Sequence, residues 1–373
     1  MEKLLFVSAS DFNNLNFGGG KASLRNYNIL KKFFYIDLIY LTKNRTFIKN
    51  NKNILPRTKN KFHTLVNEVF LYSGYLTFEA EQRILEKITQ EEYKFIFLDT
   101  SNYGRLSKKI KKINSKIKII SFFHNIEYDY IKAIIKTSTS KLKYLNFIKL
   151  RSSKYNEELA AKYSDYCITL NPRDTKRLYE VYGGKSNLEL PITFEDKYSK
   201  NTNNLLKEKD YILFVGSLFF ANYHGIKWFV ENIMPHLNKK LLIVGKDFEI
   251  KKIELERENV EVIGSVEDLT PYYLNASYMI MPIFEGAGMK VKTAEALMYG
   301  KTIYGTTEAF EGYEVEYNKV GGLCNTKEEF IEKINNDKNE VFNEYSRKIF
   351  LEKYSFESSL NRMKEFLEKE NLI

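Results

Sequence analysis

The sequence predicts an α/β protein of two Rossmann-like domains, each with a parallel β-sheet, facing a central cleft. Short, nearly unbroken apolar runs alternate with segments of helical periodicity along the whole chain, as expected for parallel sheets covered by helices. The length of 373 residues is sufficient for two domains with large cores. A strand followed by a glycine-containing turn and a helix begins the chain and begins again at Tyr211. We therefore expect the functional site in the cleft between two similar halves.

The first half begins with a strand at 4–7, a polar loop, and the glycine-rich loop Gly18-Gly19-Gly20-Lys21 before a helix at 22–34. Residues 43–61 are polar and basic, and we interpret them as a surface loop. The other expected elements are strands at 35–41, 95–98, 117–123 and 166–170, and helices at 78–89, 104–114, 149–163 and 172–183.

Residues 195–209 are rich in Lys, Asn, Asp and Glu, which favours an interdomain linker. We therefore predict one domain at 1–195, joined by a C-terminal helix at about 355–373, and a second at 205–354. The second half is expected to contain strands at 211–215, 241–244, 260–263, 278–283 and 302–304, and helices at 225–234, 291–298, 326–334 and 357–368.

The stretch at 276–300 is the most informative part of the chain. A buried strand is followed by the turn Gly286-Ala287-Gly288 and by a helix, so free N–H groups and the positive helix end point at the turn. Lys290 and Lys292 fall in the first helical turn, where cations are unfavourable for the helix itself. A bound phosphate would explain them. The alternative is an ordinary strand-to-helix connection with two solvated lysines.

The formal net charge of +10 is unevenly distributed. Residues 1–200 hold 36 Lys and Arg against 20 Asp and Glu, a balance of +16, and the remainder has a balance of −6. Six lysines lie between Lys108 and Lys118, within and after a predicted helix. Such asymmetry indicates an anionic partner, either a phosphorylated substrate or an anionic membrane surface. No recognition module accompanies these lysines, which argues against nucleic acid. The alternative explanation is an AT-rich genome, which raises the content of Lys, Asn, Ile and Tyr.

Cys167 and Cys324 have no metal-type spacing and are expected to be reduced structural thiols. The apolar run at residues 4–7 is too short for a signal peptide, and no stretch reaches the roughly 18 apolar residues of a spanning helix. We expect a cytoplasmic protein, with peripheral association at the inner face of the membrane as a further hypothesis.

The central stretch resembles the nucleotide-sugar site of group 1, or family 4, glycosyltransferases, which have the GT-B fold. Gly286, Gly288, Lys290, Lys292 and Glu295 fit the pattern Gly-x-Gly-x-(Arg/Lys)-x-Lys-x-x-Glu-Ala of an exopolysaccharide-type subset. Many other members carry two Glu residues separated by seven others. Here the first of these would fall on Ala287, and Glu285 lies two positions too early.

Other segments resemble the same subset. Phe123-His124-Asn125-Ile126-Glu127 is similar to its His-Asn-x-Glu signature, and a Trp-Phe pair follows Gly216-Ser217 in the next helix, after Asn222. Lys227 lies inside that helix, and no Arg stands where many members bind the diphosphate. The segment 305–313 is also similar to the subset. The resemblance implies that the last helix crosses back onto the first domain.

The resemblance implies retaining transfer of a sugar from a nucleoside diphosphate sugar to a hydroxyl. Lys290, Lys292 and the helix N-terminus would stabilise the leaving diphosphate, Glu295 would hold the ribose and His124 would contact the donor sugar. No metal is expected, since the sequence has no Asp-x-Asp triplet between strands and no His/Cys cluster. The donor-binding loops would include Gly19, Gly20, Gly216, Ser217, Gly264, Ser265, Gly286, Ala287, Gly288 and Met289.

The acceptor is expected to be a sugar, a lipid-linked molecule or a protein, in the assembly of bacterial surface polysaccharide, glycolipid or glycoprotein. Two alternatives share the fold. One is a nucleotide- or carbohydrate-binding protein without turnover, which the displaced Glu285 favours. The other is a sugar-nucleotide 2-epimerase, whose expected set of carboxylates is not apparent in the sequence.

Overall fold

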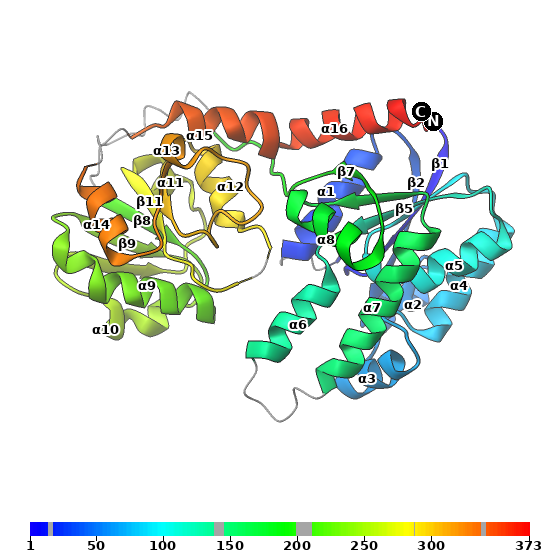
Figure 1. The fold of residues 1–373 in the computed structure, drawn as a ribbon. Coiled ribbons are helices and arrows are strands. Elements are labelled where there is room, and N and C mark those ends of the chain that lie inside the picture. The colour runs from blue at the N-terminus through cyan, green and yellow to red at the C-terminus, as the bar shows by residue number, and fades with distance from the viewer. Residues whose placement is uncertain (14–17, 138–144, 199–210, 287, 337–340) are drawn as a thin grey trace. The chain divides into compact units, whose positions relative to one another are not determined.

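A computed structural model of the chain describes residues 1–13, 18–137, 145–198, 211–286, 288–336 and 341–373 (Figure 1). These residues form two compact units. Unit 1 comprises Met1–Pro191 together with Ser359–Ile373, and unit 2 comprises Ile192–Ser358. Each unit is built around one parallel sheet.

The sheet of unit 1 has seven strands in the order β3-β2-β1-β4-β5-β6-β7, all paired in parallel. The chain moves from β1 to β2 in one direction and from β4 to β5 in the other, so the strand order reverses between β1 and β4. The strands are β1 (Lys3–Ser8), β2 (Tyr35–Thr42), β3 (Ile54–Pro56), β4 (Phe95–Leu98), β5 (Lys118–Phe123), β6 (Tyr166–Thr169) and β7 (Ser186–Glu189).

Helices cover this sheet because its strands are apolar on both faces. Leu5 and Val7 belong to a buried core that also contains Ile84 of α4 and Ile110 of α5. Phe6, between them, instead contacts the ring of Tyr27 in α1 at 5.9 Å between centroids. The helices are α1 (Gly18–Leu30), α2 (Arg45–Asn50), α3 (Lys61–Val69), α4 (Phe78–Gln90), α5 (Gly104–Ile113), α6 (Glu127–Thr137), α7 (Leu145–Tyr163) and α8 (Pro172–Tyr182).

The sheet of unit 2 has six parallel strands in the order β10-β9-β8-β11-β12-β13, which reverses between β8 and β11. The strands are β8 (Tyr211–Val215), β9 (Lys240–Val244), β10 (Val260–Gly264), β11 (Tyr278–Met281), β12 (Thr302–Gly305) and β13 (Gly321–Leu323). The helices are α9 (Phe220–Asn232), α10 (Lys252–Leu255), α11 (Thr270–Asn275), α12 (Val291–Met298), α13 (Tyr317–Val320), α14 (Lys327–Asn335), α15 (Glu344–Ile349) and α16 (Phe356–Lys369).

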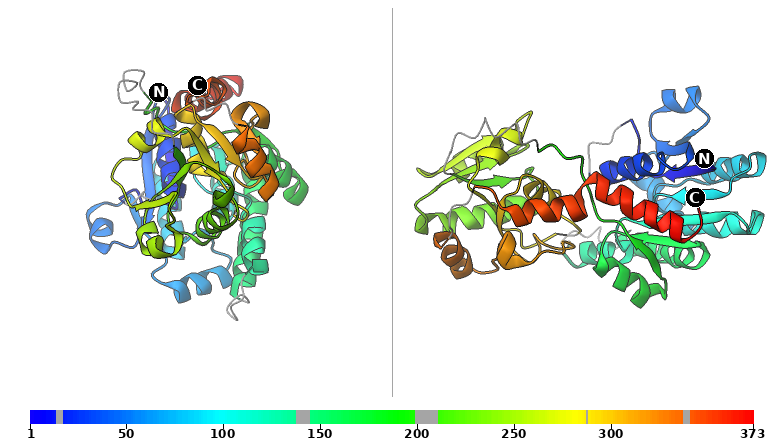
Figure 2. Two further views of the ribbon diagram at one scale, coloured as in Figure 1. Left: turned by 90° about the vertical axis from the view of Figure 1, so that its left-hand side faces the viewer. Right: turned by 90° about the horizontal axis from the view of Figure 1, so that it is seen from above.

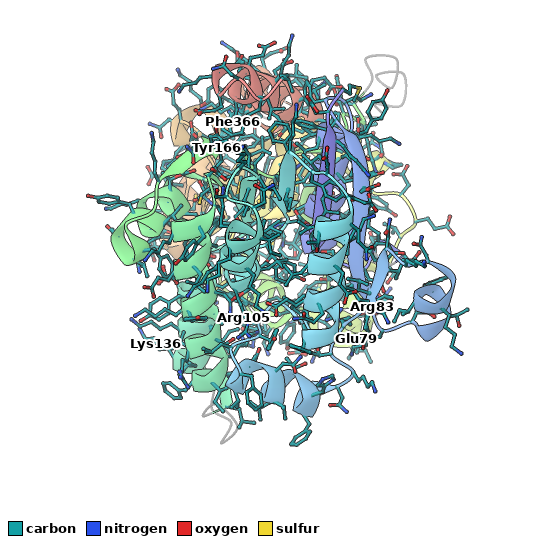
Figure 3. The ribbon with its side chains drawn as sticks, turned by 90° about the vertical axis from the view of Figure 1, so that its right-hand side faces the viewer. Glu79, Arg83, Arg105, Lys136, Tyr166 and Phe366 are labelled. Atoms are coloured by element: carbon teal, nitrogen blue, oxygen red, sulfur yellow. The ribbon has the colours of Figure 1, made fainter. Side chains whose placement is uncertain are left out.

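Helix α16 begins in unit 2 and carries the chain back to unit 1, where its residues from Ser359 onward belong. Phe366 packs edge-on against Tyr166 of β6, with ring centroids 5.4 Å apart (Figure 3). The N- and C-termini therefore lie side by side (Figure 2). The two-domain, parallel-sheet fold and the returning C-terminal helix predicted from the sequence are confirmed.

Two local predictions are wrong. Residues 43–61 are not a loop throughout, because Asn44 caps α2 and the apolar pair Ile54 and Leu55 is buried in the edge strand β3. Gly19 and Gly20 do not form a loop either, because they lie in the first turn of α1. A helix N-terminus tolerates glycine more readily than a helix interior does, and its first N–H groups lack partners within the helix.

Candidate nucleotide-sugar site

The candidate site in unit 2 lies at the carboxyl edge of its sheet, where the strand order reverses and where open parallel sheets bind ligands. Gly216 directly follows β8. A Cβ atom added to Gly216 would lie 2.9 Å from Nδ2 of Asn222 and 3.0 Å from Nζ of Lys292. The next loop approaches Gly216 as closely, since a Cβ at Gly245 would lie 1.9 Å from the Gly216 carbonyl oxygen. Glycine at these positions lets the loops meet around the lysine.

Lys292 occupies the first turn of α12, and its Nζ donates a 2.7 Å hydrogen bond to Oδ1 of Asn222. The ammonium also lies 4.6 Å from the ring centroid of Phe214. Burial, and to a smaller extent the neighbouring Lys290, lower the pKa of Lys292 to about 7, although Glu295 acts in the opposite direction. Lys292 makes no ion pair with any residue that the structure describes. Its ammonium is therefore a desolvated cation that an anionic ligand would stabilise.

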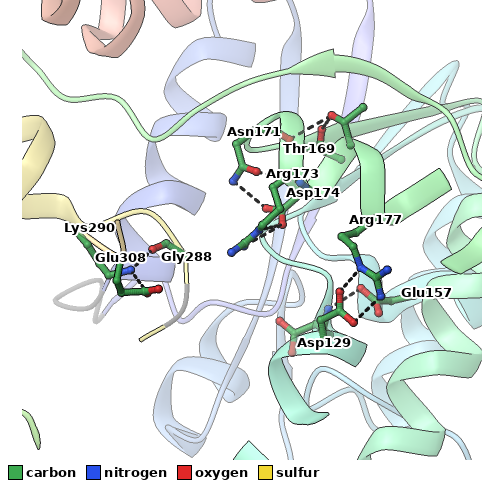
Figure 4. A network of polar contacts seen from close by, with 12 residues as sticks. Asp129, Glu157, Thr169, Asn171, Arg173, Asp174, Arg177, Gly288, Lys290 and Glu308 are labelled. Atoms are coloured by element: carbon green, nitrogen blue, oxygen red, sulfur yellow. Dashed lines mark hydrogen bonds and ion pairs between the residues drawn. The ribbon is translucent and has the colours of Figure 1, made fainter. Parts of the chain in front are cut away.

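Lys290 immediately precedes α12, in the N-cap position, and not in the first turn as predicted. Its Nζ donates to the Gly288 carbonyl oxygen at 2.7 Å and forms an ion pair with Glu308 at 2.5 Å (Figure 4). Its own carbonyl accepts a 2.6 Å hydrogen bond from the hydroxyl of Tyr313. These contacts fix the backbone at the start of α12 and hold the ammonium beside the turn.

The turn itself has the geometry of a close-approach loop. Gly288 has φ of 72°, in the left-handed region that favours glycine, and Met289 is buried. A Cβ at Gly286 would lie 2.9 Å from Oε1 of Glu308. Ala287, predicted to bind the donor through its backbone, lies outside the described residues.

Glu295 lies in the second turn of α12. It accepts a 3.0 Å hydrogen bond from the hydroxyl of Tyr273, whose ring stacks on Tyr299 at 4.9 Å. Tyr273 is fully buried, and burial together with Glu295 raises the pKa of its hydroxyl well above the usual value, so it stays a donor. Tyr273 thus holds one oxygen of the carboxylate in place.

The remaining glycine loops of unit 2 are already hydrogen-bonded internally. The Ser265 hydroxyl donates to Glu249 at 2.9 Å, and the Ser265 N–H donates to the same carboxylate at 3.0 Å. Gly264 has φ of 79°, and a Cβ there would lie 2.5 Å from that carboxylate. Ser217 offers its carbonyl to Nδ2 of Asn222 at 2.8 Å, which orients the amide toward Lys292.

In unit 1 the structure places His124 just after β5, beside the end of β4. Its Nε2 lies 3.1 Å from the Asp99 carbonyl oxygen and 3.4 Å from the Asp99 carboxylate. Asp99 is buried and accepts hydrogen bonds from Ser8 at 2.8 Å and from Asn26 at 2.9 Å. His124 therefore stands at the carboxyl edge, supported by the ends of β1, β4 and β5. His124 belongs to unit 1.

The N-terminus of α6, which follows His124, already holds an anion of the protein. The carboxylate of Glu157 accepts hydrogen bonds from the N–H groups of Glu127 at 2.9 Å and Tyr128 at 3.0 Å. Ser101 and Tyr182 donate to the same carboxylate at 3.1 and 2.8 Å. Burial raises the pKa of Glu157 to about 7 despite these bonds.

The sequence did not indicate Asp99, Glu157, Tyr273 or Glu308 as site residues, and it gave Asn222 no role. For Asp99 a signal exists, since an acidic residue directly follows a buried strand at the expected ligand edge. The other four act through partners far away in sequence. No group of three or more His, Cys, Asp or Glu side chains that could hold a metal ion occurs within the described ranges.

Comparison with known proteins finds a family match within the second half of the chain. Residues 209–336 match the family described as "Glycosyl transferases group 1". A Klebsiella pneumoniae protein described as "Uncharacterized 44.6 kDa protein in cps region" is 24% identical over 365 residues, covering 90% of this chain and 91% of that protein. The predicted resemblance to group 1 glycosyltransferases is thereby confirmed, whereas the Gly-x-Gly-x-Lys-x-Lys motif itself is not part of that finding.

Solved structures agree on the fold. Sucrose-phosphate synthase from Thermosynechococcus elongatus superposes with a TM-score of 0.69 at 13% identity, covering 99% of each chain. HepE of Anabaena, solved with UDP, superposes with a TM-score of 0.65 at 13% identity, covering 99% of this chain and all of HepE. HepE has also been solved with UDP-glucose. The two parallel-sheet units are those of the GT-B fold.

Proposed function

We propose that this GT-B protein, whose second unit matches the group 1 glycosyltransferases, transfers a sugar with retention from a nucleoside diphosphate sugar to a hydroxyl. The observation that carries the proposal is Lys292, a desolvated ammonium bound to a neutral amide at the reversal point of the unit 2 sheet. Lys290 and the N-terminus of α12 add positive charge beside it.

The chemical difficulty of the reaction is the charge on the leaving group. As the bond between the anomeric carbon and the phosphate oxygen breaks, the departing diphosphate gains negative charge. Lys292 and Lys290 would stabilise that charge more in the transition state than in the bound donor, which lowers the barrier. Lys290 would exchange its contact with Glu308 for the diphosphate, since both partners are anionic.

We assign the remaining donor contacts by position. Glu295, oriented by Tyr273, would accept hydrogen bonds from the ribose hydroxyls, and the backbone of Gly216, Ser217, Gly264 and Ser265 would line the nucleotide. The turn at 286–289 would approach the diphosphate. In unit 1, His124 would contact the donor sugar, and the first turn of α1 with Gly19 and Gly20 would present N–H groups.

A panel of nucleotide sugars, with UDP-glucose first, tests the proposal. The expected result is thermal stabilisation by at least one donor, followed by its slow hydrolysis and by glycosyl transfer when a sugar, lipid-linked or protein acceptor is present. Binding without hydrolysis or transfer would favour the non-catalytic alternative, and conversion to an epimeric nucleotide sugar would favour the 2-epimerase. Activity should persist in a chelator. Loss on chelation with recovery by Mg²⁺ or Mn²⁺ would contradict metal independence.

We also propose that the basic surface of unit 1 binds the anionic inner face of the membrane, where a lipid-linked acceptor would be located. No helix among the described residues is both long and apolar enough to cross a bilayer. Part of the lysine cluster serves the fold, because Lys109 pairs with Glu81 at 2.5 Å and Lys111 pairs with Asp165 at 2.6 Å. Lys112 and Lys116 are exposed.

Vesicle co-sedimentation tests this surface. Lysines near an anionic bilayer contribute about 1 kcal/mol each, and salt screens the attraction over roughly 8–10 Å. The protein should bind anionic vesicles, release them at high salt, and bind more weakly when Lys108, Lys112 and Lys116 become Gln. Equal recovery with neutral and anionic vesicles, or none with either, would favour a soluble acceptor.

A further inference from the structure

A pocket of about 370 Å³ lies on unit 2 beside the turn at 286–289, outside the set of residues proposed to bind the donor. Its floor is the N-terminal half of α9, where Ala221 and Gly225 are one turn apart. Gly225 must be glycine, since a Cβ there would lie 1.7 Å from the Pro282 carbonyl oxygen. The other lining residues are His224, Trp228, Phe284, Glu285 and Asn325.

Two aromatic rings form one side of the pocket. Trp228 of α9 and Phe284, which follows β11, meet edge to face with centroids 4.8 Å apart. Phe284 is 44% exposed, so part of its ring is accessible to a ligand. The pocket therefore offers an apolar wall of two nearly perpendicular rings.

Polar groups without partners face the same pocket. Among the described residues, the Glu285 carboxylate and the His224 imidazole make no hydrogen bond or ion pair. Asn325 uses its Oδ1 to accept from the N–H of Thr307 at 3.0 Å and from the Thr307 hydroxyl at 3.2 Å. That arrangement fixes the amide and leaves its Nδ2 donor for a ligand.

We propose that this pocket binds an uncharged hexopyranose ring of the saccharide on which the enzyme acts, at a site separate from that of the donor. A pyranose has an apolar C–H face and a rim of hydroxyls, which match the aromatic wall and the donors and acceptors of Glu285, His224 and Asn325. The carboxylate disfavours phosphate and uronic acid ligands. The choice of a saccharide rests on the proposed function.

The pocket and the donor site share two loops. On the loop after β11, Glu285 lines the pocket, and the next residue, Gly286, packs against Lys290 and Glu308. On the loop after β12, Thr307 is held by Asn325 of the pocket, and Glu308 is held by Lys290 of the donor site. This gives the displaced Glu285 a role in the pocket in place of a contact with the donor.

Trp228 is the single tryptophan of the chain, so all tryptophan emission comes from a residue that lines this pocket. The test titrates the full-length protein with the methyl glycosides of glucose, galactose and mannose, and with galacturonate as the charged comparison. The expected result is a saturable change in emission with at least one neutral glycoside and at least tenfold weaker binding in both Glu285→Ala and Asn325→Ala. Both variants should bind UDP as the unmodified protein does, which also verifies that they are folded.

Lys292→Ala separates the two proposals, because it should lose UDP binding and keep the saccharide response. The pocket assignment is overturned if no neutral glycoside gives a saturable response, if both pocket variants respond unchanged, or if galacturonate binds equally well. A saccharide response in a protein that turns over no nucleotide sugar would instead overturn the proposed function and leave the pocket in place.

Discussion

Helices α6 and α12 both begin at the carboxyl edge of a parallel sheet, yet their N-termini are neutralised differently. The first N–H groups of α6 bind the buried carboxylate of Glu157. Helix α12 has no side-chain cap, and it carries Lys290 at its N-cap position and Lys292 in its first turn. One N-terminus carries its anion within the fold, and the other adds cations where the helix dipole already disfavours them. This difference supports our proposal that α12 binds an external anion, whereas the N-terminus of α6 is already occupied by a carboxylate of the protein.

The largest expected effect is a loss of stability when the Glu157 carboxylate is removed. Glu157→Ala removes the acceptor of four hydrogen bonds, of which one is buried and three are partly buried. Each buried donor left unsatisfied costs about 1–3 kcal/mol, so the free energy of unfolding should fall by roughly 3 kcal/mol. Urea unfolding measures this change. The exposed neighbour Glu158→Ala is the control, with an expected change within about 0.5 kcal/mol. Equal effects would mean that the carboxylate does not hold α6.

On α12 the opposite behaviour is expected. Lys292→Ala should weaken UDP binding roughly ten- to a hundredfold, because a charge-assisted hydrogen bond contributes about 1.5–3 kcal/mol, and Lys290→Ala should act similarly. Stability without ligand should not fall for Lys292→Ala, since the variant removes a desolvated cation. Calorimetric titration measures affinity. Lys227→Ala serves as the control, because Lys227 pairs with Glu254 at 2.6 Å. Unchanged affinity in both α12 variants would contradict the anion site.

Glu295→Gln should lower donor affinity about tenfold and reduce turnover, with the melting temperature little changed, because it keeps the shape and removes the charge that the ribose contact uses. Glu308→Gln is the informative partner. It removes the negative charge that pairs with Lys290 and should leave UDP affinity the same or tighter. Steady-state kinetics on both variants decides the matter, and wild-type kinetics in Glu295→Gln would remove that residue from the site.

A smaller effect is expected from pH. Because the pKa of Lys292 in the free protein is lowered to about 7, the lysine loses its proton above that pH, and UDP affinity should fall by up to about tenfold per pH unit there. Lys292→Arg stays charged and should flatten this slope, and an unchanged slope in that variant would assign the titration to another group. Stability without ligand should rise as the pH increases from about 7 to the ordinary pKa of lysine. Over that interval Lys292 binds a proton in the unfolded chain but not in the folded protein. Lys301, whose pKa burial also lowers to about 7, adds to that rise, so only the affinity slope is specific to Lys292.

The sequence predicted those features of the two helix N-termini that are formed by residues close together in the chain. The strand, the glycine turn and the helix start around Lys290 and Lys292 follow from residues adjacent in the chain. The pairing of Lys292 with Asn222 joins residues 70 positions apart, and that of Lys290 with Glu308 joins residues 18 apart. Such pairings depend on which strands become neighbours. Helix α6 was missed for the same reason, because its N-terminus depends on Glu157 of α7. The short strand β3 has only two buried apolar residues, too few for a periodic signal.

The return of α16 to unit 1 has a consequence for synthesis of the chain. The residues of unit 2 are contiguous, so its core forms from one uninterrupted stretch of the chain. Unit 1 is completed only after Ser359–Ile373 have been made, since they pack on strands made long before, as Phe366 does against Tyr166. The half of the protein that emerges first therefore finishes folding last. Loss of Ser359–Ile373 would therefore damage the unit that is most distant from them in sequence, and leave the unit that contains Lys290 and Lys292 intact.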